Sequence, residues 1–483
     1  MLNKKIKKVN LINNLISNIL RDIDFNNELF YFNFLNLIRP HDIFLKKYLV
    51  FFNTSKIDIT KFVFLASIKF VLTSIFNLFL SIRKTDFELP KNTKLILISH
   101  LVNKFDEKND RYFNELDNIL IKNNIYYSKI LFNYQTDNFF SNNNNIIINK
   151  YGDFFMEIKV IFKQINLFFN YYKFRNKLIN KKKKIIFNFY NLFLLSILSN
   201  ECRNNIRFSI IISKVIKKNN NLKNFICTLE GHNWEKIAFS SIKKNNPNIK
   251  TIGYTNALIF KDQKIISNKN KFSSNPDLIF TNCENNKDII SKNYKNYKNN
   301  NIIINIGNLN FKQFEINDIL KNKVEINKVC LVLPENIDSE FYYFLNFINK
   351  YLLRYDNLKF NIKIHPGMKN NKKINKIINR NKNNKIFYSF DNINEQIFNA
   401  DYVLYRGSGS ILIPLFLNKR IIYLDDKKGF FINPLHQNSN NIEKISNPDN
   451  LYKITILKNS LNYDFIDQYI EKPNTHKILS FLS

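Results

Sequence analysis

Residues that break or cross-link a chain are scarce in this sequence. Its 483 residues include 8 glycines, 10 prolines, 4 cysteines and one tryptophan. The cysteines stand far apart without a C-x-x-C pair, which argues against a disulfide framework or a zinc site and for a reduced, cytosolic chain. Because glycine is so rare, two glycines close together indicate a place where the backbone needs them. The cysteines are Cys202, Cys227, Cys283 and Cys330.

Acidic residues are also few. The chain has 39 Asp and Glu against 73 Lys and Arg, which gives a formal net charge of +34. Such a balance is typical of nucleic-acid-binding proteins, but aromatic and basic residues do not interleave at the spacing of the known modules. The charge is spread over separate pieces, for example 180–184 and 371–385. We interpret it as a solvated face. Adhesion to an anionic membrane surface and attraction of phosphate-bearing substrates are the alternatives.

An unbroken apolar run of the signal-peptide or membrane-spanning type is missing. The first 20 residues are basic but lack the apolar core of a signal peptide. Residues 62–82 have nearly the length of a span, yet Lys69 falls inside them, and residues 185–199 are too short. We predict that both segments form buried or amphipathic helices. The protein is expected to be cytoplasmic and at most peripheral on the inner membrane.

Strand-length apolar runs are what the sequence has in quantity. Hydrophobic residues make up 45% of the chain, and its 483 residues predict two domains. In the first half, continuous apolar runs alternate with polar, helix-compatible segments such as 284–293, and 151–220 is predicted to be a group of packed helices. The runs are 94–100, 129–134, 224–230, 249–254, 277–283 and 301–307.

A second alternation of strands and helices begins after a polar bridge at about 308–327. Its nearly fixed spacing predicts a doubly wound α/β domain. We therefore expect two Rossmann-like domains that face each other across a cleft, with ligands at the carboxyl ends of the strands. The second strand series is 328–335, 359–366, 385–390, 401–408 and 420–425. The predicted division is a helical extension (1–90), a first domain (91–315), a second domain (316–462) and a C-terminal helix (463–483).

One strand end of the second domain presents a histidine. Pro366 fixes φ and holds His365 in an extended conformation, and Gly367 lets the chain turn sharply. The imidazole would then lie at the rim of the cleft, able to donate to a phosphate oxygen. Lys363, two residues earlier, is a further cation at the same strand end. The alternative is a turn that happens to carry a histidine.

Another strand end of the same domain carries a Ser-Gly-Ser turn. The segment 405–415 has the pattern of a strand end, a glycine-flanked turn and a helix. Free N–H groups at a helix N-terminus, with two hydroxyls beside them, form an anion site, unless one serine is only the N-cap. Two phosphate-competent elements on one sheet favour the anion site. Its candidate residues are Arg406, Gly407, Ser408, Gly409 and Ser410.

A third group lies in the first domain. Glu230 ends a predicted strand, Gly231 follows in a turn, and a helix begins behind them. A carboxylate at a strand's carboxyl end, across a cleft from a phosphate site, is placed as a general base should be. The alternative is that Glu230 or Glu235 caps the helix and that Trp234 lies in the core. Candidates for acceptor contact are His232, Trp234, Glu235, Tyr254 and Asn256.

These motifs resemble those of a known family. Five short segments occur in the order found in bacterial surface carbohydrate biosynthesis proteins, which are glycosyltransferase-like and have the GT-B fold. They are LEGHNWE (229–235), IGYTNA (252–257), NPD (275–277), KIHP (363–366) and GSGS (407–410). The Glu-Gly, His-Pro and Ser-rich elements also resemble those of sialyltransferases, polysialyltransferases and Kdo transferases, which use CMP-activated sugars. The resemblance covers about 221–430.

The resemblance implies roles for the matching residues. Glu230 matches the acidic residue that acts as the base, and His365 matches the histidine that contacts the donor phosphate. Pro366 would pack near the nucleobase, and Ser408 and Ser410 match the hydroxyls that hold the phosphate. A C-terminal helix that crosses back to the first domain is also implied.

Two positions depart from the pattern of the resemblance. Relatives tend to have a histidine near the position of Asn256. Many GT-B enzymes place a glutamate that holds the donor ribose shortly after the Ser-rich turn, whereas this chain has apolar residues at 411–414. Recognition of the ribose therefore has no counterpart in the sequence at that place.

Together these observations predict an inverting, metal-independent glycosyltransferase of surface polysaccharide assembly. Its donor would be a CMP-linked sugar of the sialic acid or Kdo kind, and its acceptor a glycan or glycolipid, with no cofactor and no nucleic acid. One alternative is a CDP-glycerol-type polyol phosphate transferase on the same fold. The other is a non-catalytic basic protein that binds a membrane or nucleic acid, which predicts a continuous basic stripe and tolerance of alanine at Glu230 and His365.

Overall fold

The structure is a computed structural model that describes both predicted sheets and their helices. Pro366, Gly367 and most of the polar bridge lie outside the described residues. The described residues are 28–30, 32, 56–82, 89–100, 112–132, 145–147, 152–178, 184–260, 274–293, 302–311, 328–335, 338–365, 368, 371–381, 383–390, 393–425, 433–456 and 463–482.

The first domain is built on a seven-stranded sheet in the order β3-β2-β1-β4-β5-β6-β7. Every neighbouring pair is parallel. β4 is buried along its whole length, as expected for an apolar strand covered on both faces. The strands are β1 (Leu95–His100), β2 (Tyr127–Phe132), β3 (Asn145–Ile147), β4 (Asn224–Thr228), β5 (Lys250–Thr255), β6 (Leu278–Thr281) and β7 (Ile302–Asn305).

The second domain has a six-stranded parallel sheet in the order β10-β9-β8-β11-β12-β13. In both sheets the first strand has the second on one side and the fourth on the other, so the order reverses there. In such open sheets ligands bind at this switch point. The strands are β8 (Val329–Leu333), β9 (Lys359–Lys363), β10 (Ile386–Ser389), β11 (Tyr402–Tyr405), β12 (Arg420–Leu424) and β13 (Glu443–Ile445).

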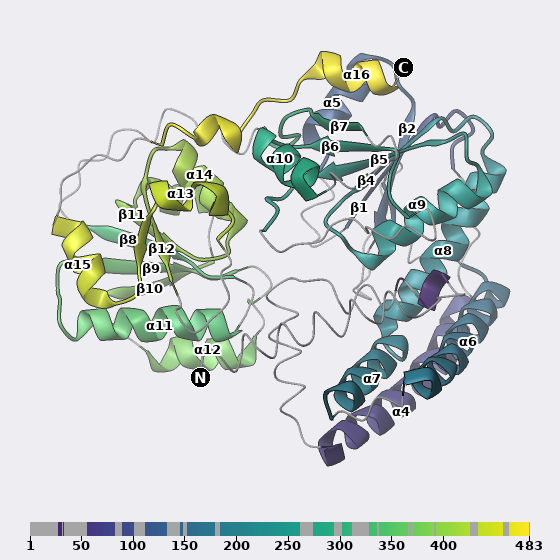
Figure 1. Cartoon of the computed structure of the whole chain (residues 1–483), viewed down its shortest axis with the longest axis horizontal. Coiled ribbons are helices and arrows are strands. Elements are labelled where there is room, and N and C mark those ends of the chain that lie inside the picture. The colour runs from purple at the N-terminus through teal and green to yellow at the C-terminus, as the bar shows by residue number, and fades with distance from the viewer. Residues whose placement is uncertain are drawn as a thin grey trace.

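Helices cover both faces of each sheet, and the two domains lie side by side (Figure 1). In the second domain, α11 and α12 lie on one face, and α13 and α14 lie on the other. The predicted α/β class, with two doubly wound parallel sheets covered by helices, is confirmed. The helices are α5 (Asn114–Lys122), α9 (Asn233–Asn245), α10 (Glu284–Asn293), α11 (Asp338–Leu352), α12 (Lys372–Arg380), α13 (Ile393–Phe398), α14 (Leu412–Phe416) and α15 (Pro448–Ile456), with short 3-10 turns η6 (Gly409–Ile411), η7 (His436–Asn441) and η8 (Ile466–Gln468).

Four long helices form a group that projects from the first domain: α4 (Lys56–Ser81), α6 (Phe154–Leu178), α7 (Lys184–Ile197) and α8 (Asn200–Lys218) (Figure 1). The prediction of packed helices over 151–220 is confirmed. α8 packs on α9, with the Phe208 and Trp234 rings 5.9 Å apart and edge to face. The predicted helix over 62–82 is present as α4. Of the two predicted alternatives, buried or amphipathic, burial is wrong, because only 6% of the most apolar part of α4 is buried.

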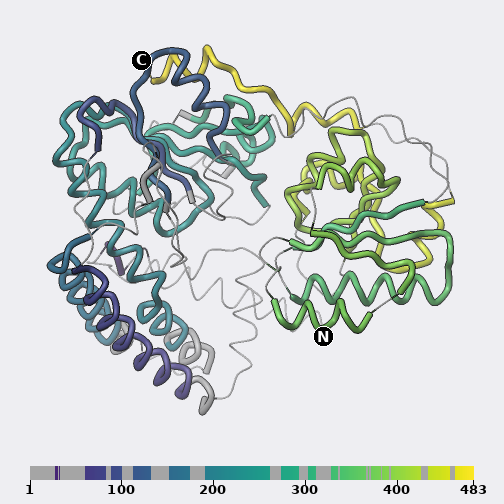
Figure 2. The backbone as a smooth tube through the Cα atoms, turned by 180° about the vertical axis from the view of Figure 1, so that it is seen from behind, coloured from purple at the N-terminus to yellow at the C-terminus, as the bar shows by residue number. Residues whose placement is uncertain are grey.

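The C-terminal segment crosses from the second domain back to the first, as seen from behind in Figure 2. It ends in α16 (Thr475–Leu482), whose Ile478 and Leu482 pack into the core on one face of the first sheet. Backbone hydrogen bonds join the crossing segment to the residues that follow β7. The N–H of Asn308 donates to the Glu471 carbonyl, and the N–H of Asn474 donates to the Ile306 carbonyl. At Gly307, with φ +84°, a side chain would collide with the passing backbone.

Candidate functional site

The carboxyl end of β4 lies at the switch point of the first sheet and is organised by Glu235. The buried carboxylate of Glu235 accepts hydrogen bonds from the backbone N–H groups of Glu230 (3.0 Å), Gly231 (2.8 Å) and His232 (2.7 Å). It also accepts one from the Thr228 hydroxyl at 3.1 Å. Glu235 therefore fixes the turn between β4 and α9 from inside, in the manner of a capping box.

The side chain of Glu230 lies on the outer side of this turn. Its Oε2 lies 3.1 Å from Nε2 of His232, and the two side chains are 24% and 28% exposed. Gly231, between them, has φ +85°, a left-handed conformation that favours glycine. The turn thus brings a carboxylate and an imidazole together at the edge of the sheet. His232, which we predicted to contact the acceptor, contacts the predicted base.

Two further residues that we predicted to contact the acceptor substrate lie in the core of the first domain. Trp234 is fully buried behind the turn, with its ring stacked on His232 at 6.2 Å. Tyr254, in β5, is fully buried, and its hydroxyl accepts the N–H of Leu309 at 3.0 Å. Burial raises the pKa of the Tyr254 phenol well above its usual range. Both side chains support the edge of the sheet from within.

Asn256 lies half-buried beyond the end of β5, beside an asparagine network that the sequence did not reveal. Asn282 donates to the Asn256 carbonyl at 3.0 Å and accepts from Asn286 at 2.7 Å. Asn286 in turn donates to the Ala257 carbonyl at 2.8 Å and accepts from the Ile259 N–H at 3.0 Å. These bonds fix the loop that follows β5. Since asparagine is abundant throughout the chain, no single one could be distinguished beforehand.

In the second domain, the ends of β9 and β11 flank the end of β8. Lys363 is the last residue of β9, and His365 follows it, half-buried. The N–H of Ile364 still bonds to Ser389 of the neighbouring strand at 2.9 Å, so His365 begins where pairing with β10 stops. With a strand spacing of about 4.8 Å, the ends of β9 and β11 are about 10 Å apart.

The Ser-Gly-Ser turn follows β11 at the switch point of the second sheet. Ser408 takes the N-cap position of η6, but its side chain makes no cap hydrogen bond, so the interpretation of this serine as a simple cap is not supported. Gly409 is exposed, and a Cβ placed on it would meet nothing within 4 Å. Ser410 is half-buried. The expected long helix is instead η6 followed by the five residues of α14.

Arg406 and Gly407, which lie between β11 and the Ser-Gly-Ser turn, are buried. The guanidinium of Arg406 donates from Nε to Glu340 of α11 at 2.8 Å and from Nη1 to the Leu424 carbonyl at 3.0 Å. It also lies 5.2 Å from the centre of the Tyr343 ring. Arg406, predicted to contact the donor, is thus placed inside the domain, where it ties α11 to the ends of β11 and β12.

The carboxyl edges of the two sheets meet through a shared apolar cluster. Leu258, Cys283 and Phe311, which follow β5, β6 and β7, belong to one buried cluster with Ile411 of the second domain. The rings of Phe311 and Phe416 are 6.3 Å apart and edge to face. The apolar residues that stand in place of a ribose-binding glutamate therefore pack between the domains, and the Ser-Gly-Ser turn lies beside this junction.

The NPD segment lies at the opposite edge of the first sheet. Asp277 precedes β6, and its carboxylate accepts from the Thr251 N–H at 2.9 Å and the Thr251 hydroxyl at 2.6 Å. Lys243 lies 2.7 Å from the same carboxylate. Burial alone would raise the pKa of Asp277, but these hydrogen bonds hold it below its usual value. Asp277 therefore fixes the amino ends of β5 and β6.

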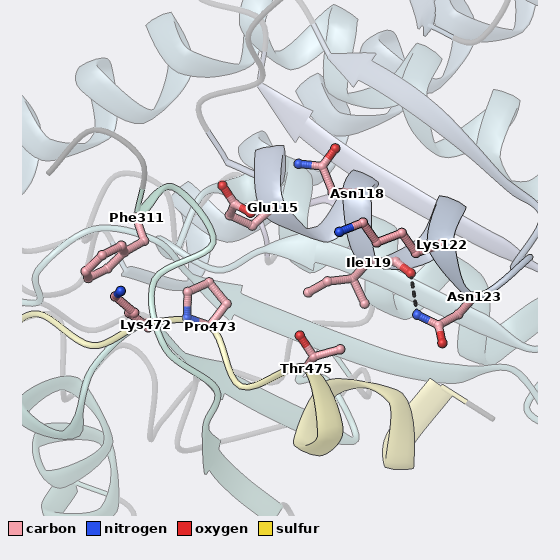
Figure 3. A pocket seen from close by; sticks show the side chains of 9 residues that line it. All are labelled: Glu115, Asn118, Ile119, Lys122, Asn123, Phe311, Lys472, Pro473 and Thr475. Carbon is pink, nitrogen blue, oxygen red and sulfur yellow. Dashed lines mark hydrogen bonds between the residues drawn. The ribbon is translucent and has the colours of Figure 1, made fainter. Parts of the chain in front are cut away.

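A cavity of about 300 Å³ lies away from all these groups, between α5 and the crossing segment (Figure 3). Phe311, Lys472 and Thr475 line it together with residues of α5. It contains none of the predicted site residues. Within the described ranges, no group of three or more His, Cys, Asp and Glu side chains is placed to hold a metal ion. All four cysteines are buried free thiols.

No family model and no curated protein matches the chain. Similar solved structures include a UDP-GlcNAc 2-epimerase from Methanocaldococcus jannaschii (15% identity, TM-score 0.46, 81% of this chain and 99% of that one). They also include the Neisseria meningitidis UDP-GlcNAc 2-epimerase bound to UDP-GlcNAc (12%, 0.44, 80% and 99%) and a variant of the wall teichoic acid polymerase TagF (10%, 0.42, 89% and 98%). Similarity at this level does not bear on the reaction or on single residues.

Proposed function

We propose that the protein is an inverting glycosyltransferase that moves a sugar from a nucleotide-activated, CMP-linked donor to a glycan or glycolipid of the bacterial surface. The observation that supports this is the meeting of two carboxyl edges. One carries the Glu230–His232 pair at its switch point, and the other carries His365 and the Ser408–Ser410 turn on both sides of β8. A base on one domain and an anion site on the other are what transfer to a hydroxyl requires.

Glu230 serves as the general base in this proposal. Its carboxylate takes the proton of the acceptor hydroxyl while the hydroxyl oxygen attacks the anomeric carbon of the donor. The bond from that carbon to the phosphate oxygen breaks on the opposite side, and the phosphate keeps the electron pair. His232 hydrogen-bonds to Glu230 and holds its orientation, and Glu235 holds the backbone beneath both.

The second domain holds the donor phosphate over the end of β8. His365 from one side and the hydroxyls of Ser408 and Ser410 from the other can reach a phosphate placed between strand ends about 10 Å apart. Lys363 adds positive charge at the same edge. The buried ion pair of Arg406 with Glu340 supports the turn from behind and makes no contact with the donor in this proposal.

Nucleotide binding and turnover by His365→Ala test the proposal. CMP at about 100 times its dissociation constant should stabilise the parent protein by about 2.7 kcal/mol, a clear rise in melting temperature. His365→Ala should weaken that rise and slow transfer by about 10²–10³-fold, the scale of one lost charge-stabilising donor. His476→Ala, an exposed histidine of α16, is the matched control. Unchanged CMP binding and turnover in His365→Ala would refute the donor site.

The fate of the donor phosphorus separates the two transfer reactions. In sugar transfer the nucleophile attacks carbon, so all donor phosphorus leaves with the nucleotide. In transfer of a polyol phosphate from a CDP-glycerol-type donor, the nucleophile attacks phosphorus, and one donor phosphate appears in the product. A product free of donor phosphorus supports the glycosyltransferase, and a labelled product supports the polyol phosphate transferase.

A further inference from the structure

Helix α4 turns apolar side chains to the solvent and polar side chains to the protein, the opposite of a usual surface helix. A surface helix normally turns its apolar stripe inward and its polar residues to water. Here Phe64, Phe76 and Phe79 point outward, with 65%, 62% and 68% of their surfaces exposed. The inward positions include Thr73 and the buried Ser74. The other exposed large apolar side chains of α4 and its end are Phe62, Leu65, Ile68, Val71, Leu72, Ile75, Leu80 and Ile82.

A buried arginine of α8 fixes α4 in this orientation. Arg203 donates to the Thr73 hydroxyl at 2.7 Å, to the Ser74 hydroxyl at 2.6 Å and to the Phe70 carbonyl at 3.1 Å. Its Nε donates to Gln164 of α6 at 3.2 Å. Turning the apolar side of α4 inward would leave this buried guanidinium without these partners, which is strongly destabilising. The outward apolar side is therefore built into the packing.

Helix α6 continues the same kind of surface. Its Phe155, Phe162 and Phe169 are exposed, whereas Glu157 and Gln164 are turned inward and buried. Glu157 there accepts hydrogen bonds from Nε and Nη2 of Arg207 of α8, at 2.5 and 2.8 Å. We name the exposed apolar side chains of α4 and α6 the apolar face. Large apolar side chains exposed in such number on two helices that contact each other indicate an interaction site.

Basic residues greatly outnumber acidic ones around the apolar face, where Asp58, Asp153 and the buried Glu157 lie at the amino ends of the two helices. Residues 59–85, which contain most of α4, have 4 basic and no acidic residues. Residues 158–200, which contain most of α6 and all of α7, have 9 basic and no acidic residues. Lys61, Lys69, Lys159, Lys163 and Lys173 are exposed on these helices beside the phenylalanines. Basic and aromatic side chains on one helical surface suit the headgroup region of an anionic bilayer.

We propose that the apolar face docks the protein on an anionic lipid bilayer, with α4 and α6 lying in the plane of the interface. The phenylalanines enter the boundary between headgroups and acyl chains, and the lysines pair with the anionic headgroups. The proposal does not depend on the transfer reaction proposed above.

The packing argues against a spanning arrangement of α4. Its 26 residues extend about 39 Å, enough to cross a hydrocarbon core of about 30 Å. Arg203, however, is bonded near the middle of α4, and Gln164 joins α6 to the same point. A spanning α4 would carry this guanidinium and the lysines of α6 to membrane depth, which is costly. An in-plane helix leaves them on the protein side.

Charge also argues against a second copy of the chain as the partner of the apolar face. Two such faces would bring the basic residues of both copies together, with no acidic residue within 59–85 or 158–200 to pair with them. Like charges brought together in this way are destabilising. An anionic bilayer supplies the missing negative charge.

Flotation of the full chain with lipid vesicles tests the proposal without nucleotide or acceptor. The parent should float with vesicles of phosphatidylcholine and phosphatidylglycerol, and less with phosphatidylcholine alone or at high salt. The double variant Phe64→Ser/Phe76→Ser should lower the partition coefficient by at least about tenfold. Its outward side chains do not support the core, so circular dichroism should match the parent. Leu353→Ser in the second domain, 84% exposed, is the control and should float like the parent.

Three results would overturn the proposal. The first is equal flotation of the parent and the double variant. The second is resistance of the bound protein to extraction with alkaline carbonate, which would mean that α4 spans the bilayer. The third is a lipid-free dimer, measured by light scattering, that the double variant converts to monomer, because the apolar face would then join two copies. Binding that needs anionic lipid, is released by carbonate and is lost in the double variant supports it.

Discussion

Exchanging each of two glutamates for glutamine should separate the catalytic carboxylate from the one that builds the turn. Glu230→Gln keeps the shape of the side chain but cannot accept a proton. We expect it to lower turnover by about 10²–10⁴-fold, the usual range for a general base, and to leave nucleotide affinity nearly unchanged. Its contact with His232 is partly exposed to solvent and is worth about 1 kcal/mol or less, so the melting temperature should hardly change.

Glu235→Gln should behave differently because its carboxylate is buried and fully used. It accepts from the N–H groups of three successive residues and from one hydroxyl. A glutamine keeps one acceptor oxygen and turns an NH₂ group toward the remaining donors. If two hydrogen bonds to a charged group are lost at about 1.5 kcal/mol each, the loss is about 3 kcal/mol. For a domain of this size that lowers the melting temperature by about 6–12 °C.

The assay pairs a thermal melt with nucleotide affinity and transfer rate for both variants. Glu284→Gln is the matched control, since Glu284 stands in the first turn of α10 after β6 but is 44% exposed. It should change stability by less than about 1 kcal/mol. If Glu235→Gln loses the rate without losing stability, Glu235 is the base and our assignment is wrong. If neither variant slows transfer, the enzyme hypothesis loses its main support.

Two further predictions follow from single residues. Gly409→Ala should fold normally, because the added methyl meets nothing within 4 Å, yet it should weaken CMP binding at least several-fold if the donor phosphate lies there; unchanged affinity would remove the phosphate from this turn. Asp277→Asn should cost about 1 kcal/mol above pH 5, because the pKa of Asp277 is lower in the folded state than in the unfolded chain. That contribution is lost as the pH falls through the folded pKa, so urea unfolding should show parent and variant converging in acid, and a constant difference would contradict the assignment.

The strands were predictable because burial on both faces demands long apolar runs. Every predicted run corresponds to a strand, and 284–293 to α10. The two missed strands, β3 and β13, are edge strands of three residues, too short to form a recognisable apolar run. The error at 62–82 has another cause. Apolar composition predicts burial only when the partner of a helix is its own domain, and α4 turns its polar residues to that domain.

The strand-end positions of the candidate site residues were predictable, and the positions of the side chains that support them were not. Glu230, His365 and Ser408 stand where rare glycines and prolines interrupt apolar strands, and the sequence shows those interruptions. Whether Glu235 lines the cleft or caps the turn depends on rotation about α9, which spacing in the chain does not determine. Arg406 is a similar case, because its partner Glu340 is 66 residues away and no local pattern links them.

The apolar residues after the Ser-Gly-Ser turn bear on both the fold and the candidate site. Ile411, with 0% of its surface exposed, belongs to the cluster that joins the carboxyl edges of both sheets. A glutamate at this place would bring a charge into that apolar cluster, and burying a carboxylate without a partner costs several kcal/mol. In this chain the position therefore stabilises one relative placement of the two domains. A donor ribose, if bound here, must be held by other groups at the end of β8 or β9.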